Sequence, residues 1–349
     1  RSPGWRSTVE RDLPALWRSP QWRAALESWL LPALADAGRT VTGALVQERV
    51  RFWSTVLHVE TDAGRVWVKE NAPSQAFEAA LVEVVEGIVP GWCAPVVAVD
   101  TERGWLATAD LGMPLWHDDV PPPLDDWVDV VEGYAVAQRE IADHADTVLS
   151  AGVPAFPEAP DDVVAWVTDL MDELRALPLD DPRRPTGEET TLVDEGLARI
   201  HEAAAVLAES GMPSTLQHND LHLGNAFRRP GGGMNYIDLG DAVWAHPLTA
   251  LRTPLWIVRH RFGLAPDGPD ARRVVDAGLG PWTDRWDRDT LVALLPAADR
   301  LSCLHRAESW ARLQRDVPVR VVDEGWVRSV IEWVVDAAAK DPYASGLPR

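Results

Sequence analysis

Residues 218–225 and 236–240 contain the side chains whose types and spacing are best suited to chemistry. Asp220 and Asn225 lie five residues apart, and Asp238 follows Asn225 by 13 residues at the end of an apolar run. Transfer of a phosphoryl group needs a carboxylate that accepts the proton of the attacking hydroxyl. It also needs oxygen ligands that hold magnesium against the nucleotide phosphates. We therefore interpret Asp220 as the general base, and Asn225 and Asp238 as magnesium ligands.

Two other interpretations of these residues stay open. Asp220, Asn225 and Asp238 could each cap a nearby turn or strand, but their joint spacing would then be accidental. His218, Asp220 and His222 could instead be ligands of a hydrolase metal ion, with Asp238 as a fourth ligand. The remaining histidines are scattered along the chain and form no second cluster. We therefore expect His218 to be a structural imidazole that braces the loop.

Lysine occurs only at Lys69 and Lys340 in this arginine-rich chain, so each lysine marks a position that favours a compact point charge. Lys69 ends an expected strand, and Glu78 lies on the helix expected to follow. A strand lysine held by a helix glutamate can present its ammonium to the α- and β-phosphates of a nucleotide. We predict this role for the pair. Glu83 is the alternative partner, and an ordinary surface ion pair is the simpler interpretation.

The rest of a nucleotide site is less clearly marked. No G-x-G-x-x-G loop joins the first two expected strands, where residues 50–55 read VRFWST. Ser54 and Thr55 are weak candidates for phosphate contacts there. Thr108 and Asp110 lie where the last expected strand meets the helices. An extended hinge there could bind an adenine edge through backbone groups, and a plain linker is the alternative.

The elements that must position these groups change in character along the chain. Residues 1–40 predict a helical extension, with Pro20 between two helices. Residues 41–110 predict a compact α+β lobe of order β-β-β-α-β-β. Its expected strands are 44–51, 53–60, 65–70, 94–100 and 105–109, with a helix at 74–89 capped by Ser74. Residues 111–349 predict a helical lobe around a loop at 216–241, with helices at 124–142, 161–177, 188–209, 247–262, 287–313 and 323–340.

The charge and hydropathy of the chain limit the kinds of molecule that it can be expected to bind. The 349 residues include 33 basic and 54 acidic side chains, a formal charge of −21. Such a surface repels nucleic-acid phosphates and attracts small cations, although acidity can also serve solubility alone. No apolar stretch reaches the ~20 residues of a membrane span, and no signal peptide is evident. We expect no nucleic-acid or membrane partner, a cytoplasmic location, and buried free thiols at Cys93 and Cys303.

The motif residues at 218–225 and 237–242 resemble those of the aminoglycoside phosphotransferase and choline kinase-like family. Weaker agreement extends the resemblance from about residue 41 to residue 255. It implies a bilobal protein-kinase-like fold of class α+β, with a small β-rich N-lobe and a large helical C-lobe. It also implies ATP and Mg²⁺ as cofactors. Asp220 would be the catalytic residue, Asn225 and Asp238 the magnesium ligands, and Lys69 the phosphate-binding lysine that pairs with Glu78.

The chain departs from the family pattern at three places. Asn219 replaces a usual glycine, Leu223 replaces a common proline, and residues 245–247 read Ala-His-Pro where many members have Gly-Asp-Pro. These changes spare the base and the metal ligands, and they affect the residues that would brace the loop. They indicate a divergent subfamily.

The resemblance implies ATP-dependent phosphorylation of a hydroxyl group on a small polar molecule. Together with the acidic composition, it favours a cationic, aminoglycoside-like antibiotic as the acceptor, and thus a role in antibiotic resistance. A sugar or amino-sugar metabolite kinase is the main alternative. A non-catalytic pseudokinase and the metal-dependent hydrolase described above are further alternatives. The oligomeric state is not predicted.

Overall fold

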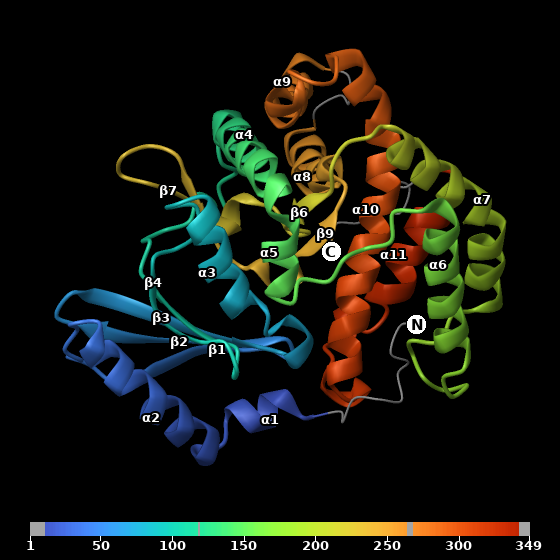
Figure 1. Ribbon diagram of the computed structural model, residues 1–349. Coiled ribbons are helices and arrows are strands. Elements are labelled where there is room, and N and C mark those ends of the chain that lie inside the picture. The colour runs from blue at the N-terminus through green and yellow to red at the C-terminus, as the bar shows by residue number, and fades with distance from the viewer. Residues whose placement is uncertain (1–10, 118, 264–267, 342–349) are drawn as a thin grey trace.

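A five-stranded antiparallel sheet forms the core of the smaller of two lobes (Figure 1). The structure is a computed structural model that describes residues 11–117, 119–263 and 268–341. The strands are β1 (Val46–Val50), β2 (Ser54–Thr61), β3 (Gly64–Asn71), β4 (Val96–Asp100) and β5 (Trp105–Ala109), in the order β1-β2-β3-β5-β4. Side chains alternate between the two faces of a strand. Val68 is therefore buried on one face, while Lys69 points to the opposite face.

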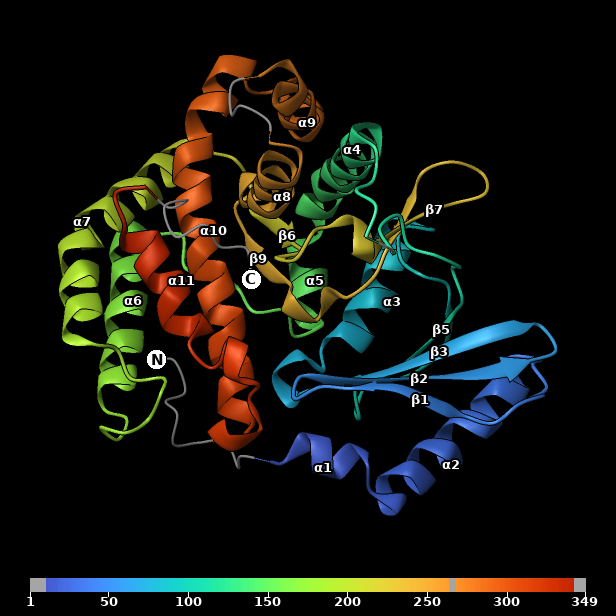
Figure 2. The ribbon, with the colours of Figure 1, turned by 180° about the vertical axis from the view of Figure 1, so that it is seen from behind.

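The helix α3 (Glu78–Ile88) covers the sheet face that looks toward the larger lobe (Figures 1 and 2). It buries Leu81, Val82 and Val85. The predicted helix at 74–89 begins too early, because Pro73–Gln75 forms a separate 3-10 turn. Ser74 is not the N-cap as predicted. Its backbone amide donates instead to Asp316 Oδ2 at 2.8 Å, which ties the turn to the larger lobe.

The helices α1 (Leu13–Trp17) and α2 (Pro20–Asp36) cover the opposite face of the sheet (Figure 1). Pro20 begins α2, as the sequence predicted, and Ser19 caps that helix by accepting from the Trp22 amide at 3.2 Å. The indole groups of Trp17 and Trp22 donate to the carboxylate of Glu70 at 2.9 and 2.7 Å. The extension is thereby bound to the strand that carries Lys69.

The larger lobe is mainly helical and has two groups of helices (Figure 1). One group is α4 (Leu124–Ile141), α5 (Ala145–Ser150), α8 (Arg252–Phe262) and α9 (Pro269–Leu279); the other is α6 (Pro160–Arg175), α7 (Gly187–Glu209), α10 (Arg288–Asp316) and α11 (Ser329–Ala338). The sequence prediction missed α5 and α9. Pro269 begins α9, which buries Val274 and Leu279, while residues 264–267 lie outside the described residues. The predicted helices at 247–262 and 323–340 begin with 3-10 turns instead.

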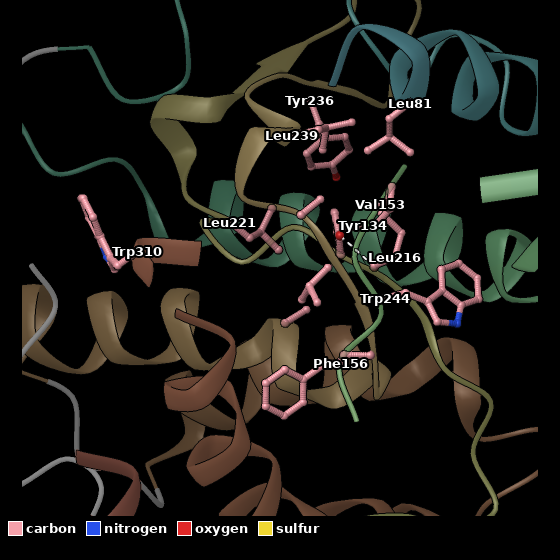
Figure 3. Close-up of a cluster of buried hydrophobic side chains, with 14 of the residues drawn as sticks. Leu81, Tyr134, Val153, Phe156, Leu216, Leu221, Tyr236, Leu239, Trp244 and Trp310 are labelled. Carbon is pink, nitrogen blue, oxygen red and sulfur yellow. Dashed lines mark hydrogen bonds between the residues drawn. The ribbon is translucent and has the colours of Figure 1, made fainter. Parts of the chain in front are cut away.

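Two short strand pairs form the island that carries the motif residues. The strand β6 (Thr215–Gln217) pairs with β9 (Val243–Ala245), and β7 (Ala226–Arg228) pairs with β8 (Met234–Tyr236). Buried tyrosines attach both pairs to α4 (Figure 3). Tyr134 donates to the Leu216 carbonyl at 3.0 Å, and Tyr236 donates to the Val130 carbonyl at 2.7 Å. The island therefore rests on a hydrogen-bonded aromatic core that holds the intervening loop in place.

The predicted bilobal α+β architecture is confirmed, with a β-rich small lobe and a helical large lobe. The division at residues 40 and 110 stays a prediction. No described helix is both long enough and apolar enough to cross a membrane. Cys93 and Cys303 are buried and free, as predicted.

Candidate active site

The backbone of the site is unusual at two positions, one in the loop between β6 and β7 and one in the loop that follows β8. Asn219 and Asp238 have φ angles of 68° and 67°, and they are the only non-glycine residues with positive φ in the described ranges. Asparagine tolerates this left-handed conformation better than other side chains do. This explains why Asn219 can stand where the family usually has glycine. Its side chain also donates to the His305 carbonyl at 2.9 Å, which braces the loop against α10.

Asp220 faces two positively charged or chargeable groups. His222 Nε2 lies 3.5 Å from Asp220 Oδ2, and Arg306 Nη1 lies 3.8 Å from Asp220 Oδ1. Burial acts to raise the pKa of Asp220, but the charges of His222 and Arg306 outweigh it and hold the pKa well below its usual range. The pKa of His222 changes in the opposite sense, because its attraction to Asp220 outweighs burial. Asp220 is therefore an ionised carboxylate at neutral pH, as a proton acceptor must be.

Arg306 is a site residue that the sequence did not reveal. It comes from α10 and is almost fully buried. Its Nη1 donates to the Asn219 carbonyl and to Asp241 Oδ2, both at 3.0 Å. Asp241 also accepts from Gln75 and Ser309, so the small lobe and α10 meet at this carboxylate. The sequence gives no signal that Arg306, one arginine among many, contacts the loop that carries Asp220, because the two segments are far apart along the chain.

Lys69 lies between two carboxylates, one of which is the predicted partner Glu78. Its Nζ donates to Glu78 Oε2 at 2.7 Å and to Asp238 Oδ1 at 2.5 Å. Burial acts to lower the pKa of Lys69, but Asp238 and Glu78 raise it above its ordinary value. Glu78 is itself fixed by Asn71 and by the Leu239 amide, which donates at 2.8 Å. Glu83, the alternative partner, is exposed on α3, so Lys69 pairs with Glu78 and not with Glu83.

Asn225 and Asp238 lie close together because the Ile237 amide donates to the Asn225 carbonyl at 3.1 Å. The Asn225 amide nitrogen faces inward, donating to the Asp220 carbonyl at 3.1 Å and lying 3.2 Å from His222 Nε2. Within the described residues, its amide oxygen accepts no hydrogen bond. Asp238 is 40% exposed and uses one oxygen for Lys69. One amide oxygen and one partly free carboxylate fit magnesium, which completes its shell with phosphate and water oxygens.

The structure does not support the hydrolase interpretation, in which His218 would be a metal ligand. His218 is buried, and its Nε2 donates to the Ile237 carbonyl at 3.0 Å. Burial lowers the pKa of His218, which keeps this imidazole neutral. In the three described ranges, no three His, Cys, Asp or Glu side chains are grouped to hold a metal ion. His218 thus braces the loop, as expected, by joining residue 218 to the end of β8.

A cavity of about 470 Å³ opens between the lobes. Lys69, Glu78 and Asp238 line one part of it, and Thr108 and Asp110 line another part near the hinge. The Asp110 carboxylate accepts from the Trp67 indole at 2.7 Å, and the Asp110 amide donates to the Arg65 carbonyl at 3.1 Å.

The structure does not bring Ser54 and Thr55 into this cavity. Both side chains are buried at the start of β2. Thr55 is bonded to Gln47 and to the Arg49 carbonyl. The Ser54 hydroxyl has no partner among the described atoms. We therefore assign neither of them a contact with phosphate.

Residues 137–273 match the model of the phosphotransferase enzyme family. The matched segment contains the whole island with Asp220, Asn225 and Asp238. The family match confirms the resemblance to the aminoglycoside phosphotransferase and choline kinase-like family that the motifs predicted. It also indicates that the protein is a phosphotransferase enzyme. Among curated proteins, no sequence matches this chain.

Solved structures share the fold over nearly the whole chain. An ethanolamine kinase of Plasmodium vivax matches with a TM-score of 0.58 at 11% identity, over 95% of this chain and 91% of its own. A macrolide 2'-phosphotransferase type I matches with a TM-score of 0.54 at 14% identity, over 93% and 99%. The ADP-bound aminoglycoside phosphotransferase APH(2'')-Ib matches with a TM-score of 0.53 at 13% identity, over 93% and 98%. At these identities the likeness shows the bilobal, kinase-like fold.

Proposed function

We propose that this protein is an ATP-dependent phosphotransferase that acts on a hydroxyl group of a small polar molecule. The observation that carries the proposal is that the ionised Asp220 lies in the same island as Asp238, which forms with Lys69 and Glu78 an ion-paired set that lines the interlobe cavity. A base for the acceptor and a cation for the nucleotide phosphates are the two charges that phosphoryl transfer needs in one place. The family match over the same segment supports it.

In this proposal, ATP occupies the cavity with its adenine against the backbone of Thr108 and Asp110. Lys69 binds the α- and β-phosphates, and Glu78 holds the lysine in position. Asn225 and Asp238 would hold magnesium, which supplies charge neutralisation to the phosphates when bound. The ADP-bound neighbour with the same fold supports nucleotide use.

The chemical step follows from the position of Asp220. The acceptor hydroxyl donates its hydrogen bond to the Asp220 carboxylate and attacks the γ-phosphorus of ATP. The new oxygen–phosphorus bond forms as the bond to the β-phosphate oxygen breaks, and the hydroxyl proton passes to Asp220. Arg306 holds the loop through Asn219 and lowers the pKa of Asp220, so the base stays ionised before the reaction.

For the acceptor, we propose a cationic aminoglycoside-like antibiotic, which would give the protein a role in resistance. The net charge of −21 and the antibiotic phosphotransferases among the neighbours support this class. The ethanolamine kinase of the same fold supports a small metabolite as the acceptor. A sugar or amino sugar is the second candidate that we propose. We also propose a cytoplasmic location, where ATP is available.

A phosphotransfer screen read by mass spectrometry tests the proposal. The wild type and Asp220→Asn are incubated with Mg·ATP and pools of aminoglycosides, macrolides, sugars, amino sugars and amino alcohols. The proposal expects one compound to gain a phosphoryl group with the wild type alone. Binding of Mg·ATP without transfer to any pool would favour a pseudokinase. Tightly bound zinc with no Mg·ATP binding would instead favour the metal-dependent hydrolase interpretation.

A further inference from the structure

The first strand of the sheet contains an irregularity that changes which side chains face the cavity. In the pairing of β1 with β2, Gln47 lies opposite Leu57 and Arg49 lies opposite Val56, so Glu48 is an extra residue on β1. A bulge of this kind redirects the side chains that follow it. It places Arg49 directly across from Val56.

Arg49 belongs to a row of residues that crosses the sheet on the cavity side. Val56 is paired with Lys69, and Lys69 is paired with Leu106. Cross-strand partners project to the same face. All four residues of the row, Arg49 included, line the interlobe cavity. Since one strand separates β1 from β3, the backbones of Arg49 and Lys69 are about 10 Å apart.

The guanidinium of Arg49 is available for a ligand. The residue is exposed, and the side chain forms no ion pair or hydrogen bond with any other residue in the described ranges. Arg49 and Asp238 line the same cavity, so the Arg49 side chain borders the space next to the carboxylate proposed for magnesium.

The tip of the hairpin between β1 and β2 is occupied by other contacts. Phe52 is 2% exposed, and the Trp53 ring lies 6.2 Å from Trp310 and 6.3 Å from Trp326. The Trp53 carbonyl accepts from the Ala72 amide. Aromatic packing against the larger lobe thus takes the place of a glycine-rich backbone that could wrap around phosphates. A planar guanidinium with several N–H donors can supply the missing contacts.

We propose that Arg49 binds the outer phosphates of the bound nucleotide, opposite Lys69, and replaces the backbone donors of a glycine-rich loop. This inference rests on the proposed function. It assigns a phosphate-binding role to a residue of β1 that no sequence motif marks.

Calorimetric titration tests the assignment with Arg49→Gln and Arg49→Lys. The matched control is Arg103→Gln, because Arg103 is exposed, pairs with Asp100 and does not line the cavity. The ligands are Mg·ATP, Mg·ADP, AMP and adenosine. A lost hydrogen bond to a charged group predicts that Arg49→Gln binds Mg·ATP about 10-fold or more weakly. Adenosine should bind unchanged, Arg49→Lys should lie between, and the control should match the wild type.

The outcomes separate this inference from the proposed function. A wild type that binds Mg·ATP and an Arg49→Gln variant that binds it equally well would overturn the role of Arg49 alone. An equal loss for ATP and adenosine would also overturn it, because the effect would then be on the fold of the small lobe. A wild type that binds no Mg·ATP would overturn the proposed function and the inference together.

Discussion

The change of Glu78 to glutamine tests how the structure holds Lys69. In the structure, Lys69 has two anionic partners, Glu78 at 2.7 Å and Asp238 at 2.5 Å. The Glu78 side chain is 4% exposed, whereas that of Asp238 is 40% exposed. In the proposed complex Asp238 would hold magnesium, and Glu78 would be the main protein anion that positions Lys69. The loss of Glu78 should therefore affect the complex more than the free protein.

The size of the effect follows from the contacts. Glutamine can still accept from the Leu239 amide through Oε1, so the loss is confined to the Oε2 side that faces Lys69 and Asn71. A hydrogen bond to a charged group contributes about 1.5–3 kcal/mol. If Lys69 loses that much of its positioning in the complex, the Kd for Mg·ATP rises about 10- to 150-fold. The free energy of unfolding should fall by only about 1–3 kcal/mol, since Asp238 still compensates the lysine.

Calorimetric titration with Mg·ATP and denaturant unfolding measure the two effects. Glu83→Gln is the matched control, because Glu83 is exposed on the same helix and its substitution removes the same charge. We expect the control to bind Mg·ATP like the wild type. If Glu78→Gln bound Mg·ATP within a factor of two of the wild type, Glu78 would not position Lys69. Equal losses in both variants would point to net charge as the cause.

Three further predictions follow from the site. Asp220→Asn should lower turnover by about 10²–10⁴-fold and leave the Kd for Mg·ATP unchanged, and near-normal turnover would remove Asp220 from the mechanism. Asp238→Ala should abolish the magnesium dependence of ATP binding, which titrations with and without Mg²⁺ check. Burial acts to raise the pKa of Asp220 but His222 and Arg306 keep it low, so the base stays ionised until the pH falls below the usual carboxyl range of about 4. Arg306→Gln should raise that pKa and move the acid limb of kcat/KM to higher pH; an unshifted limb would show that Arg306 does not set the charge of the base.

Local patterns were sufficient for much of the site and fold. The Asp220, Asn225 and Asp238 spacing follows from one short loop and the hairpin after it, and the structure keeps these residues in that island. Strand alternation and helix periodicity located the five strands of the small lobe and the main helices. The errors at Ser74 and α9 have a local cause. Pro73 begins a 3-10 turn and Pro269 begins a helix, and the composition around each proline did not indicate these elements.

The contacts made by Ser54, Arg49 and Arg306 depended on the tertiary structure. Ser54 is buried at the start of β2, next to Trp53, whose ring packs against Trp310 of the larger lobe. Arg49 faces the cavity because a bulge shifts the register of β1, and a register is a property of two paired strands. Arg306 reaches Asp220 from a helix 86 residues later in the chain.

The sequence by itself was sufficient to predict the chemistry, because the types and spacing of its reactive groups lie within single loops, strands and helices. It determined the two lobes for the same reason, since periodicity is a local property of the chain. Only the tertiary structure decided which charges surround Asp220 and which face of the sheet lines the interlobe cavity. Those contacts join segments that are distant in the sequence, and their distances exist only once the lobes have packed together.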